Sequence, residues 1–591
     1  MEKFITKNGV SVRAYQGDAM TLLAFDLDKS MKKNFVGFTI KVLTDNNRKF
    51  YIYNKMKFDK SITLPRPLTD LDNVLSSEFS PIQKFRWIHV PSTIHYIENP
   101  YFGEYTYQVT PRYIKNKALL ALDENLTVSV TITVSAFKSG NVELGFTRSF
   151  ISSQAFNYHF GNKLNLRPNK TDLTFDIKKV AGSRTLKGID TEFTYEEIHQ
   201  YLGWQARDRV MDFLDEVIND NTLKLDVFAY DLNEPLIVDK IIKLSEKGRV
   251  RVILDDYPNH IKTDCYEMKF EKLFNEKALN SNDLKRGHFK SQAHSKIFIQ
   301  RKNDANSTAL KTLTGSTNFA TNGLYINANH VVIFNDPAVS QVYADVFDAS
   351  LGQAKMDTFS TTTFAKNSHQ FNGNGIPDTT ITFAPHPEDF TTTLFENISS
   401  KILNAKSDVL FAVMIDNSNS KILDALKTQV NADSIFTFGI TDERDDIKLY
   451  KPNRKNGVKI SALEINTKLK KPFKDVINVP GLGHVIHHKF VVVDFKGDDP
   501  VVFCGSSNLA FNPEQKNGDN LIEFRDKDIV TVFAIEAIRL IDHFHWLNKG
   551  IIENISDDEM TLYNATEKTK WYTKYYNEKD LRCMERKMLI K

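Results

Sequence analysis

The sequence predicts a duplicated α/β fold, in which two βα-sheet halves pack pseudo-symmetrically, preceded by an antiparallel β-sandwich domain. Three observations lead to this prediction. Residues 127–134 alternate polar and apolar side chains, which is typical of a strand with one face in water. A strand–helix–strand pattern begins near residue 223 and again near residue 409. A His-x-Lys segment followed by Gly-Ser-x-Asn also occurs twice, so the repeat is one of whole domains.

Composition indicates a multidomain protein without a global charge bias. The 591 residues are 41% hydrophobic and 11% aromatic, enough for several cores. Seventy-seven Lys and Arg against 74 Asp and Glu leave a formal charge of +3, so any basic site must be local. Cys265, Cys504 and Cys583 are far apart and show no disulfide or zinc-site spacing. The polar start lacks the apolar core of a signal peptide, and we expect a cytoplasmic location.

The strand pattern runs from Ser11 to about Ser152, with Gly, Pro and Asn signals between the strands. This predicts an N-terminal β-rich accessory domain at residues 1–165. No catalytic spacing occurs in it, so a scaffold or targeting role is favoured over an enzymatic one.

Two α/β units follow. Thr194 and Glu197 form a capping-box pattern that opens a helix, and residues 223–230, 236–244 and 250–254 then predict a βαβ unit with parallel strands. Residues 409–414, 422–426 and 434–438 repeat that unit. The predicted halves are residues 190–356 and 388–550.

Two further segments lie outside the predicted halves. Residues 358–387, rich in Thr, Asn, Gly and Pro, predict a linker between the halves. Residues 551–591 form a C-terminal tail that is basic and aromatic. This tail could contact phosphates, but a packing arm is the favoured interpretation.

The repeated motif carries the candidate chemistry. Its downstream copy is His487-x-Lys489 with Asp494, then Gly505-Ser506-x-Asn508. On a strand His487 and Lys489 project to one face and Asp494 to the other, so we expect the aspartate to be a supporting residue. The upstream copy has Arg301 at the aspartate position, which predicts changed packing rather than lost catalysis.

The upstream copy comprises His294, Lys296, Gly315, Ser316 and Asn318. Together the two copies resemble the phospholipase D superfamily, and the resemblance covers about residues 190–550. It implies a duplicated phospholipase D-like fold whose halves share one site. It also implies metal-independent phosphodiester hydrolysis, in which one imidazole attacks phosphorus to form a phosphohistidine and the other protonates the leaving oxygen.

Carried onto this chain, the resemblance assigns roles to individual residues. The expected catalytic residues are His294, Lys296, His487, Lys489, Asn318, Asn508 and Glu523. The expected supporting residues are Ser316, Ser506, Asp494, Asn327 and Asn520. Glu523, aligned with His330 of the first half, is expected to orient His294. That makes His294 the favoured nucleophile and His487 the general acid.

Substrate and partners remain open at this stage. A phospholipid headgroup phosphodiester is favoured, because superfamily nucleases carry one copy and dimerise, whereas this chain has two copies and an accessory domain. Asn318-Phe319 resembles the nuclease motif, so a nuclease or an enzyme like the tyrosyl-DNA phosphodiesterases is the alternative. A degenerate binding or scaffold protein is the alternative from another class. We expect a monomer with possible peripheral membrane contact.

No cofactor and no metal are expected. His484, His487, His488 and Cys504 could be taken for zinc ligands, but they lack a zinc-site spacing, and adjacent residues on a strand point to opposite faces.

Overall fold

The computed structural model describes the chain except residues 71, 92–99, 150–155, 157–158, 162–164, 187–188, 353–355, 416–419, 433, 444–445, 452–456, 461–484, 553–560 and 565–569. His484 therefore lies outside the described residues. Among those described, no helix combines the length and apolarity needed to cross a membrane.

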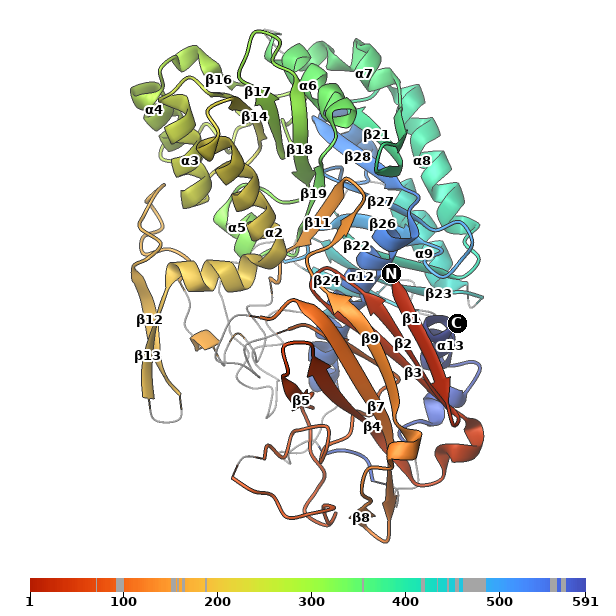
Figure 1. Ribbon diagram of the computed structural model, residues 1–591. Coiled ribbons are helices and arrows are strands. Elements are labelled where there is room, and N and C mark those ends of the chain that lie inside the picture. Colours follow the sequence, from red (N-terminus) through yellow and green to blue (C-terminus); the bar gives the residue numbers. More distant parts are fainter. Residues whose placement is uncertain are drawn as a thin grey trace.

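Two antiparallel sheets at the N-terminal end form the predicted sandwich (Figure 1). One has the order β1-β2-β3-β6, and the other β5-β4-β7-β8 with β9 paired to β7. Strand β9 alternates strictly between buried and exposed residues, as its sequence predicts. The strands are β1 (Glu2–Lys7), β2 (Val10–Gln16), β3 (Thr21–Leu27), β4 (Phe35–Thr44), β5 (Lys49–Tyr51), β6 (Arg86–His89), β7 (Gly103–Lys115), β8 (Ala118–Leu119) and β9 (Val128–Val134).

The first α/β half contains an eight-stranded sheet of order β10-β11-β19-β18-β17-β14-β15-β16. Its strands are β10 (Lys138–Ser139), β11 (Val142–Phe146), β14 (Leu223–Ala229), β15 (Val250–Leu254), β16 (Leu284–Arg286), β17 (Ile297–Lys302), β18 (Ala309–Gly315) and β19 (His330–Phe334). Its helices are α2 (Tyr195–Asn219), α3 (Pro235–Ser245), α4 (Tyr266–Lys277), α5 (Thr321–Tyr325) and α6 (Pro337–Leu351). Strands β14 and β15 are parallel, as predicted. The hairpin of β12 (Val180–Leu186) and β13 (Ile189–Thr194) leads into α2, which starts with the predicted Thr194–Glu197 capping box.

The second half contains a nine-stranded sheet of order β20-β21-β28-β27-β26-β22-β23-β24-β25. Its strands are β20 (His369–Gly373), β21 (Ile376–Ala384), β22 (Asp408–Ile415), β23 (Phe436–Glu443), β24 (Asp446–Tyr450), β25 (Val458–Ile460), β26 (Lys489–Val493), β27 (Val501–Gly505) and β28 (Asp519–Phe524). Its helices are α7 (Thr363–Lys366), α8 (Glu388–Leu403), α9 (Lys421–Asn431), α11 (Phe511–Lys516) and α12 (Lys527–Ile552). The order β21-β28-β27-β26-β22-β23 repeats β11-β19-β18-β17-β14-β15, so the fold is duplicated as predicted.

This repeat corrects two predictions. Strand β11, predicted to belong to the N-terminal domain, pairs with β19 in the first α/β sheet. Strand β21, in the predicted linker, occupies the equivalent place beside β28. The turns that precede these strands meet, because Asn141 N donates to Gly375 O at 2.6 Å and a Cβ on Gly140 would lie only 2.1 Å from that oxygen. The contact between the halves therefore requires glycine at this turn.

The C-terminal segment packs on the sandwich. Helix α13 (Leu581–Ile590) lies beside β2 and β3 (Figure 1). Trp571 and Tyr575 contact the ring of Phe85 with centroid separations of 5.6 and 4.9 Å. Trp571 and Tyr575 thus extend a hydrophobic core, as expected of a packing arm.

One hydrophobic core joins the two α/β halves. It takes Val332 and Phe334 from β19, Ile522 and Phe524 from β28, and Phe533 from α12. Because β19 and β28 lie next to the strands that precede the Gly-Ser-x-Asn segments, this shared core fixes both motif copies relative to each other.

Candidate active site

Both His-x-Lys segments enter their sheets at equivalent strands. His294 and Lys296 immediately precede β17, whereas His487 precedes β26 and Lys489 is its first residue. Their neighbours link the halves directly, since His487 N donates to Ala328 O at 3.0 Å and Ser295 Oγ donates to Gly518 O at 3.1 Å. The two copies are thus brought together, as predicted.

All four motif side chains are buried, with exposed fractions of 4% for His294, 1% for Lys296, 8% for His487 and 0% for Lys489. Burial lowers the pKa of Lys296 to about 8. Burial and the nearby charge of Lys296 also lower the pKa of Lys489. The charge of Lys296 therefore disfavours a charge on Lys489, and a bound anion would counteract this effect.

His294 is oriented by Asp519 of the second half. The Nδ1 of His294 lies 2.7 Å from Asp519 Oδ1, and the aspartate is fully buried. An ionised carboxylate only accepts hydrogen bonds, so Nδ1 carries the proton and Nε2 presents its lone pair. Burial lowers the pKa of His294, although Asp519 opposes that effect. A neutral imidazole with a free Nε2 is the form that a nucleophile requires.

The prediction that Glu523 orients His294 is wrong. Glu523 pairs with Arg525 at 2.8 Å at a partly exposed position. Gly315 pairs with Val331 and Gly505 with Leu521, so Asp519 corresponds to Asn329. Asn520 likewise corresponds to His330 and not to Asn327. Matching Asn327 with Asn520 places Glu523 opposite His330. Asn329 and Asp519 instead lie at the same distance after Asn318 and Asn508, which is the match that the strand pairing shows.

His487 has a different partner in Asn329, the counterpart of Asp519. The Nδ1 of His487 donates to Asn329 Oδ1 at 2.9 Å and lies 3.0 Å from Ser316 O. Asn329 Nδ2 donates to Gly323 O at 2.8 Å, which sets the orientation of this amide. One histidine is therefore held by a carboxylate and the other by a neutral amide, and this difference breaks the symmetry of the site.

The remaining predicted residues surround this centre. Ser316 Oγ donates to Asn329 Oδ1 at 2.8 Å, and Ser506 Oγ accepts from Asn520 N at 3.0 Å. Asn520 Nδ2 donates to Thr314 Oγ1 of the other half at 3.0 Å. The backbone carbonyl of Asn327 accepts from Thr147 Oγ1 at 2.8 Å. These four predicted residues all contact the scaffold that holds the histidines.

Asn318 and Asn508 follow the ends of β18 and β27, which lie next to β17 and β26, the strands that carry the His-x-Lys segments at their starts. Both are more than nine-tenths buried, with exposed fractions of 8% and 7%. The Oδ1 of each is buried without a hydrogen-bond partner among the described residues. A buried acceptor of this kind normally finds a donor, so each Oδ1 can accept a hydrogen bond from a ligand or a water molecule.

Asp494 points away from this centre, as predicted. Its Oδ1 accepts from Lys406 N and Ser407 N, both at 2.7 Å, and so closes the loop before β22. Arg301, at the equivalent position, is buried in an ion pair with Asp226 and lies 2.9 Å from Asp348. The exchange of Asp for Arg therefore changes packing at this position, which is remote from the histidines.

Other polar residues, which sequence reasoning missed, border the first copy. Asn318 Nδ2 donates to Asp231, which also faces His260. The ring of Tyr230 lies between His294 and His260, with centroid separations of 5.0 and 4.6 Å. Burial opposes a charge on His260, but hydrogen bonds to Asp231 and Asp255 raise the pKa of His260 to about 10. Asp231 and Asp255 thus place two carboxylates beside the first motif copy.

Comparison with a protein-family model gives two matches in this chain. Residues 214–351 and 398–541 each match the model described as "Cardiolipin synthase, PLD-like domain". These segments contain both motif copies, Asn329 and Asp519. No curated protein sequence matches the chain.

Solved structures resemble parts of the chain at low identity. Polyphosphate kinase from Porphyromonas gingivalis has 11% identity over 56% of this chain and 45% of its own, with a TM-score of 0.36. Phosphatidylserine synthase from Haemophilus influenzae has 10% identity over 57% and 84%, with a TM-score of 0.38. Nuc from Salmonella typhimurium, a phospholipase D family member, has 15% identity over 24% and 84%, with a TM-score of 0.19. The chain thus spans less than half of the kinase and most of the other two.

Proposed function

Because the chain belongs to the phospholipase D superfamily and carries its domain twice, we propose that it hydrolyses a phospholipid headgroup phosphodiester through a phosphohistidine. The observation that carries the proposal is the His294–Asp519 contact across the two halves, at 2.7 Å. It leaves one neutral imidazole ready to attack, beside a second imidazole that can donate a proton.

In the first step His294 Nε2 attacks phosphorus, and the bond from phosphorus to the leaving oxygen breaks. His487 gives its Nε2 proton to that oxygen, so the alcohol leaves neutral. In the second step His487 takes a proton from water, the water oxygen bonds to phosphorus, and the P–N bond to His294 breaks. The ammonium groups of Lys296 and Lys489 and the amide N–H groups of Asn318 and Asn508 stabilise the charge on the non-bridging oxygens.

Two features favour phospholipid over nucleic acid. Phe319, the residue that gave Asn318 its nuclease-like context, is fully buried and stacks on Phe298 at 3.9 Å, so it offers no surface to a base. The formal charge of +3 also provides little general attraction for a polyanion.

A paired assay tests the proposal. The full-length enzyme should release headgroup alcohol from phosphatidylcholine vesicles with excess chelator present, and should not cleave single-stranded DNA. Salt-sensitive cleavage of DNA without action on vesicles would make it a nuclease instead. Absence of turnover on both substrates and on bis-p-nitrophenyl phosphate, with ligand binding retained, would support the scaffold alternative.

The lowered pKa of Lys296 leads us to expect an unusual pH dependence of kcat/KM. Because the pKa of Lys296 is lowered to about 8, its ammonium is present below that pH and is lost as the pH rises through it. The value of kcat/KM should therefore fall above about pH 8, since this parameter reports the free enzyme. A profile that stays level to about pH 10, the range of an ordinary lysine, would contradict this account. Circular dichroism at each pH separates titration from unfolding.

A further inference from the structure

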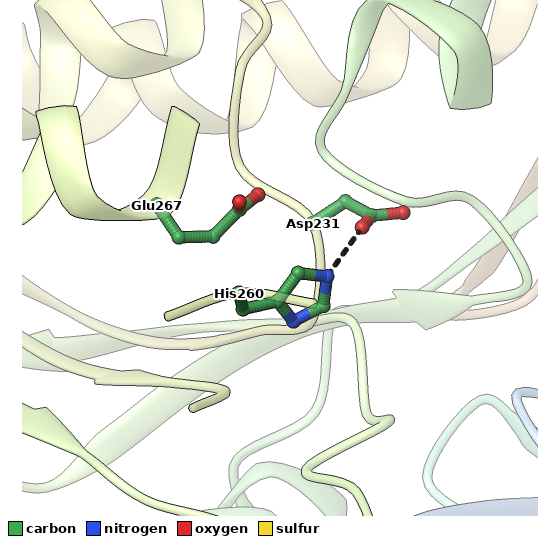
Figure 2. A group of neighbouring side chains, drawn as sticks. All are labelled: Asp231, His260 and Glu267. Atoms are coloured by element: carbon green, nitrogen blue, oxygen red, sulfur yellow. Dashed lines mark hydrogen bonds and ion pairs between the residues drawn. The ribbon is translucent and has the colours of Figure 1, made fainter. Parts of the chain in front are cut away.

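Three side chains from separate segments of the first half meet beside the active site. Asp231 follows β14, His260 lies in the loop after β15, and Glu267 is in the first turn of α4. One ligand atom from each lies within 4.8 Å of the others. Figure 2 shows the three side chains converging, with Glu267 pointing toward Asp231 and His260.

The geometry of His260 suits a metal ligand. Its Nδ1 lies 2.7 Å from Asp255 Oδ1, and its Nε2 lies 3.1 Å from Asp231 Oδ1 (Figure 2). A carboxylate on one ring nitrogen is the usual outer partner of a histidine that binds metal through the other. Two ligand atoms about 3 Å apart fit a shared cation, because Zn²⁺ lies about 2.0–2.2 Å from nitrogen and oxygen ligands.

The burial of Glu267 is an independent indication of a cation site. Its side chain is 4% exposed, and Oε1 accepts from Leu232 N at 3.2 Å. Among the described residues, no lysine, arginine or histidine nitrogen lies within ion-pair distance of this carboxylate. His260 is a positive group that acts on Glu267, but it also faces Asp231 and Asp255 and so balances only part of the negative charge of these carboxylates. A bound divalent cation would lower the cost of burying them.

The second half differs from the first at one position of this cluster. Asp442 there matches Asp255, since both carboxylates accept backbone N–H groups just before the His-x-Lys segment. The position of Asp231, by contrast, is taken by Ile415, as the pairing of β14 with β17 and of β22 with β26 shows. Asp231 is thus specific to the first half.

We propose that Asp231, His260 and Glu267 bind one divalent transition-metal ion, for which Zn²⁺ is the best match to one nitrogen and two carboxylate ligands. The ion makes no bond to the reacting phosphate in this proposal. It fixes Asp231, whose other oxygen accepts from Asn318 Nδ2, and so holds one side of the phosphate site in place.

Zinc binding to the full-length protein tests this site without an activity assay. Chelator-stripped protein is titrated with Zn²⁺ against a chromophoric chelator, in the wild type and in Glu267→Gln. The wild type should bind one equivalent tightly, and the variant should bind at least about tenfold more weakly, a loss that even outer partners of a metal can cause. Anomalous scattering at the zinc edge should place the ion between the three side chains.

The matched control is Asp256→Asn. Asp256 pairs with His288, but the side chain of His288 is 45% exposed, and no third ligand group joins the pair in the part of the chain that the structure describes. This variant should bind zinc as the wild type does. If Glu267→Gln fails to fold, as judged by circular dichroism, Asp231→Asn takes its place. No tight equivalent in the wild type, or equal affinity in a folded cluster variant, would overturn the proposal and leave a proton on His260 as the cluster's positive charge.

Discussion

Asp519→Asn should lower kcat by about 10²- to 10⁴-fold, the range associated with losing a well-placed general acid–base arrangement. The carboxylate holds the Nδ1 proton of His294 at 2.7 Å and stabilises positive charge on the ring as the P–N bond forms. An asparagine of the same size removes that charge and can present an N–H group where an acceptor is needed. Steady-state hydrolysis of bis-p-nitrophenyl phosphate measures the effect.

The matched control is Glu523→Gln. Glu523 lies on the same strand, but its partner is Arg525 at a partly exposed position. Its replacement should change kcat by less than about twofold, since partly exposed ion pairs contribute little. Equal losses in both variants, with both proteins folded, would contradict the role assigned to Asp519.

Replacing His487 should distinguish the roles of the two histidines, because only a poor leaving group needs a proton from the general acid. In His487→Asn, hydrolysis of an alkyl phosphodiester should fall by about 10²- to 10⁴-fold, because an alkoxide needs a proton to leave. The p-nitrophenyl ester should still give a burst of p-nitrophenolate, which leaves without protonation. The subsequent steady state should be slow, since His487 also activates the water.

His294→Asn provides the comparison, because it removes the proposed nucleophile. It should abolish both the burst and the turnover with either leaving group. A burst that persists in His294→Asn and disappears in His487→Asn would exchange the two roles.

Much of the fold could be predicted because the signals are local. The alternation in β9, the capping box at Thr194 and the two βαβ units each depend on residues close in sequence. Strands β11 and β21 could not be assigned in this way. Each is assigned to its sheet by pairing with a strand far along the chain, β11 with β19 and β21 with β28. By sequence alone, β11 resembles a strand of the sandwich and β21 resembles a loop.

The site residues likewise include some that local sequence signals reveal and others that only the folded structure brings together. The motif residues were recognisable because their spacing is fixed by a strand and the turn after it. Asp519 was missed because it acts on His294 across the interface of the two halves. Its sequence signal is that Asp519 follows Asn508 at the same distance at which Asn329 follows Asn318. Asp231, His260 and Glu267 come from separate segments and meet only in the folded chain, so no spacing in the sequence indicates them.

The most direct test of the central claim is to locate the covalent phosphate. Wild-type enzyme is mixed with bis-p-nitrophenyl phosphate, quenched in alkali during the burst, digested, and mapped by tandem mass spectrometry. The modification should be on His294, the imidazole that faces Asp519. Modification of His487 would contradict the assignment, and a burst without any modified histidine would contradict the phosphohistidine mechanism itself.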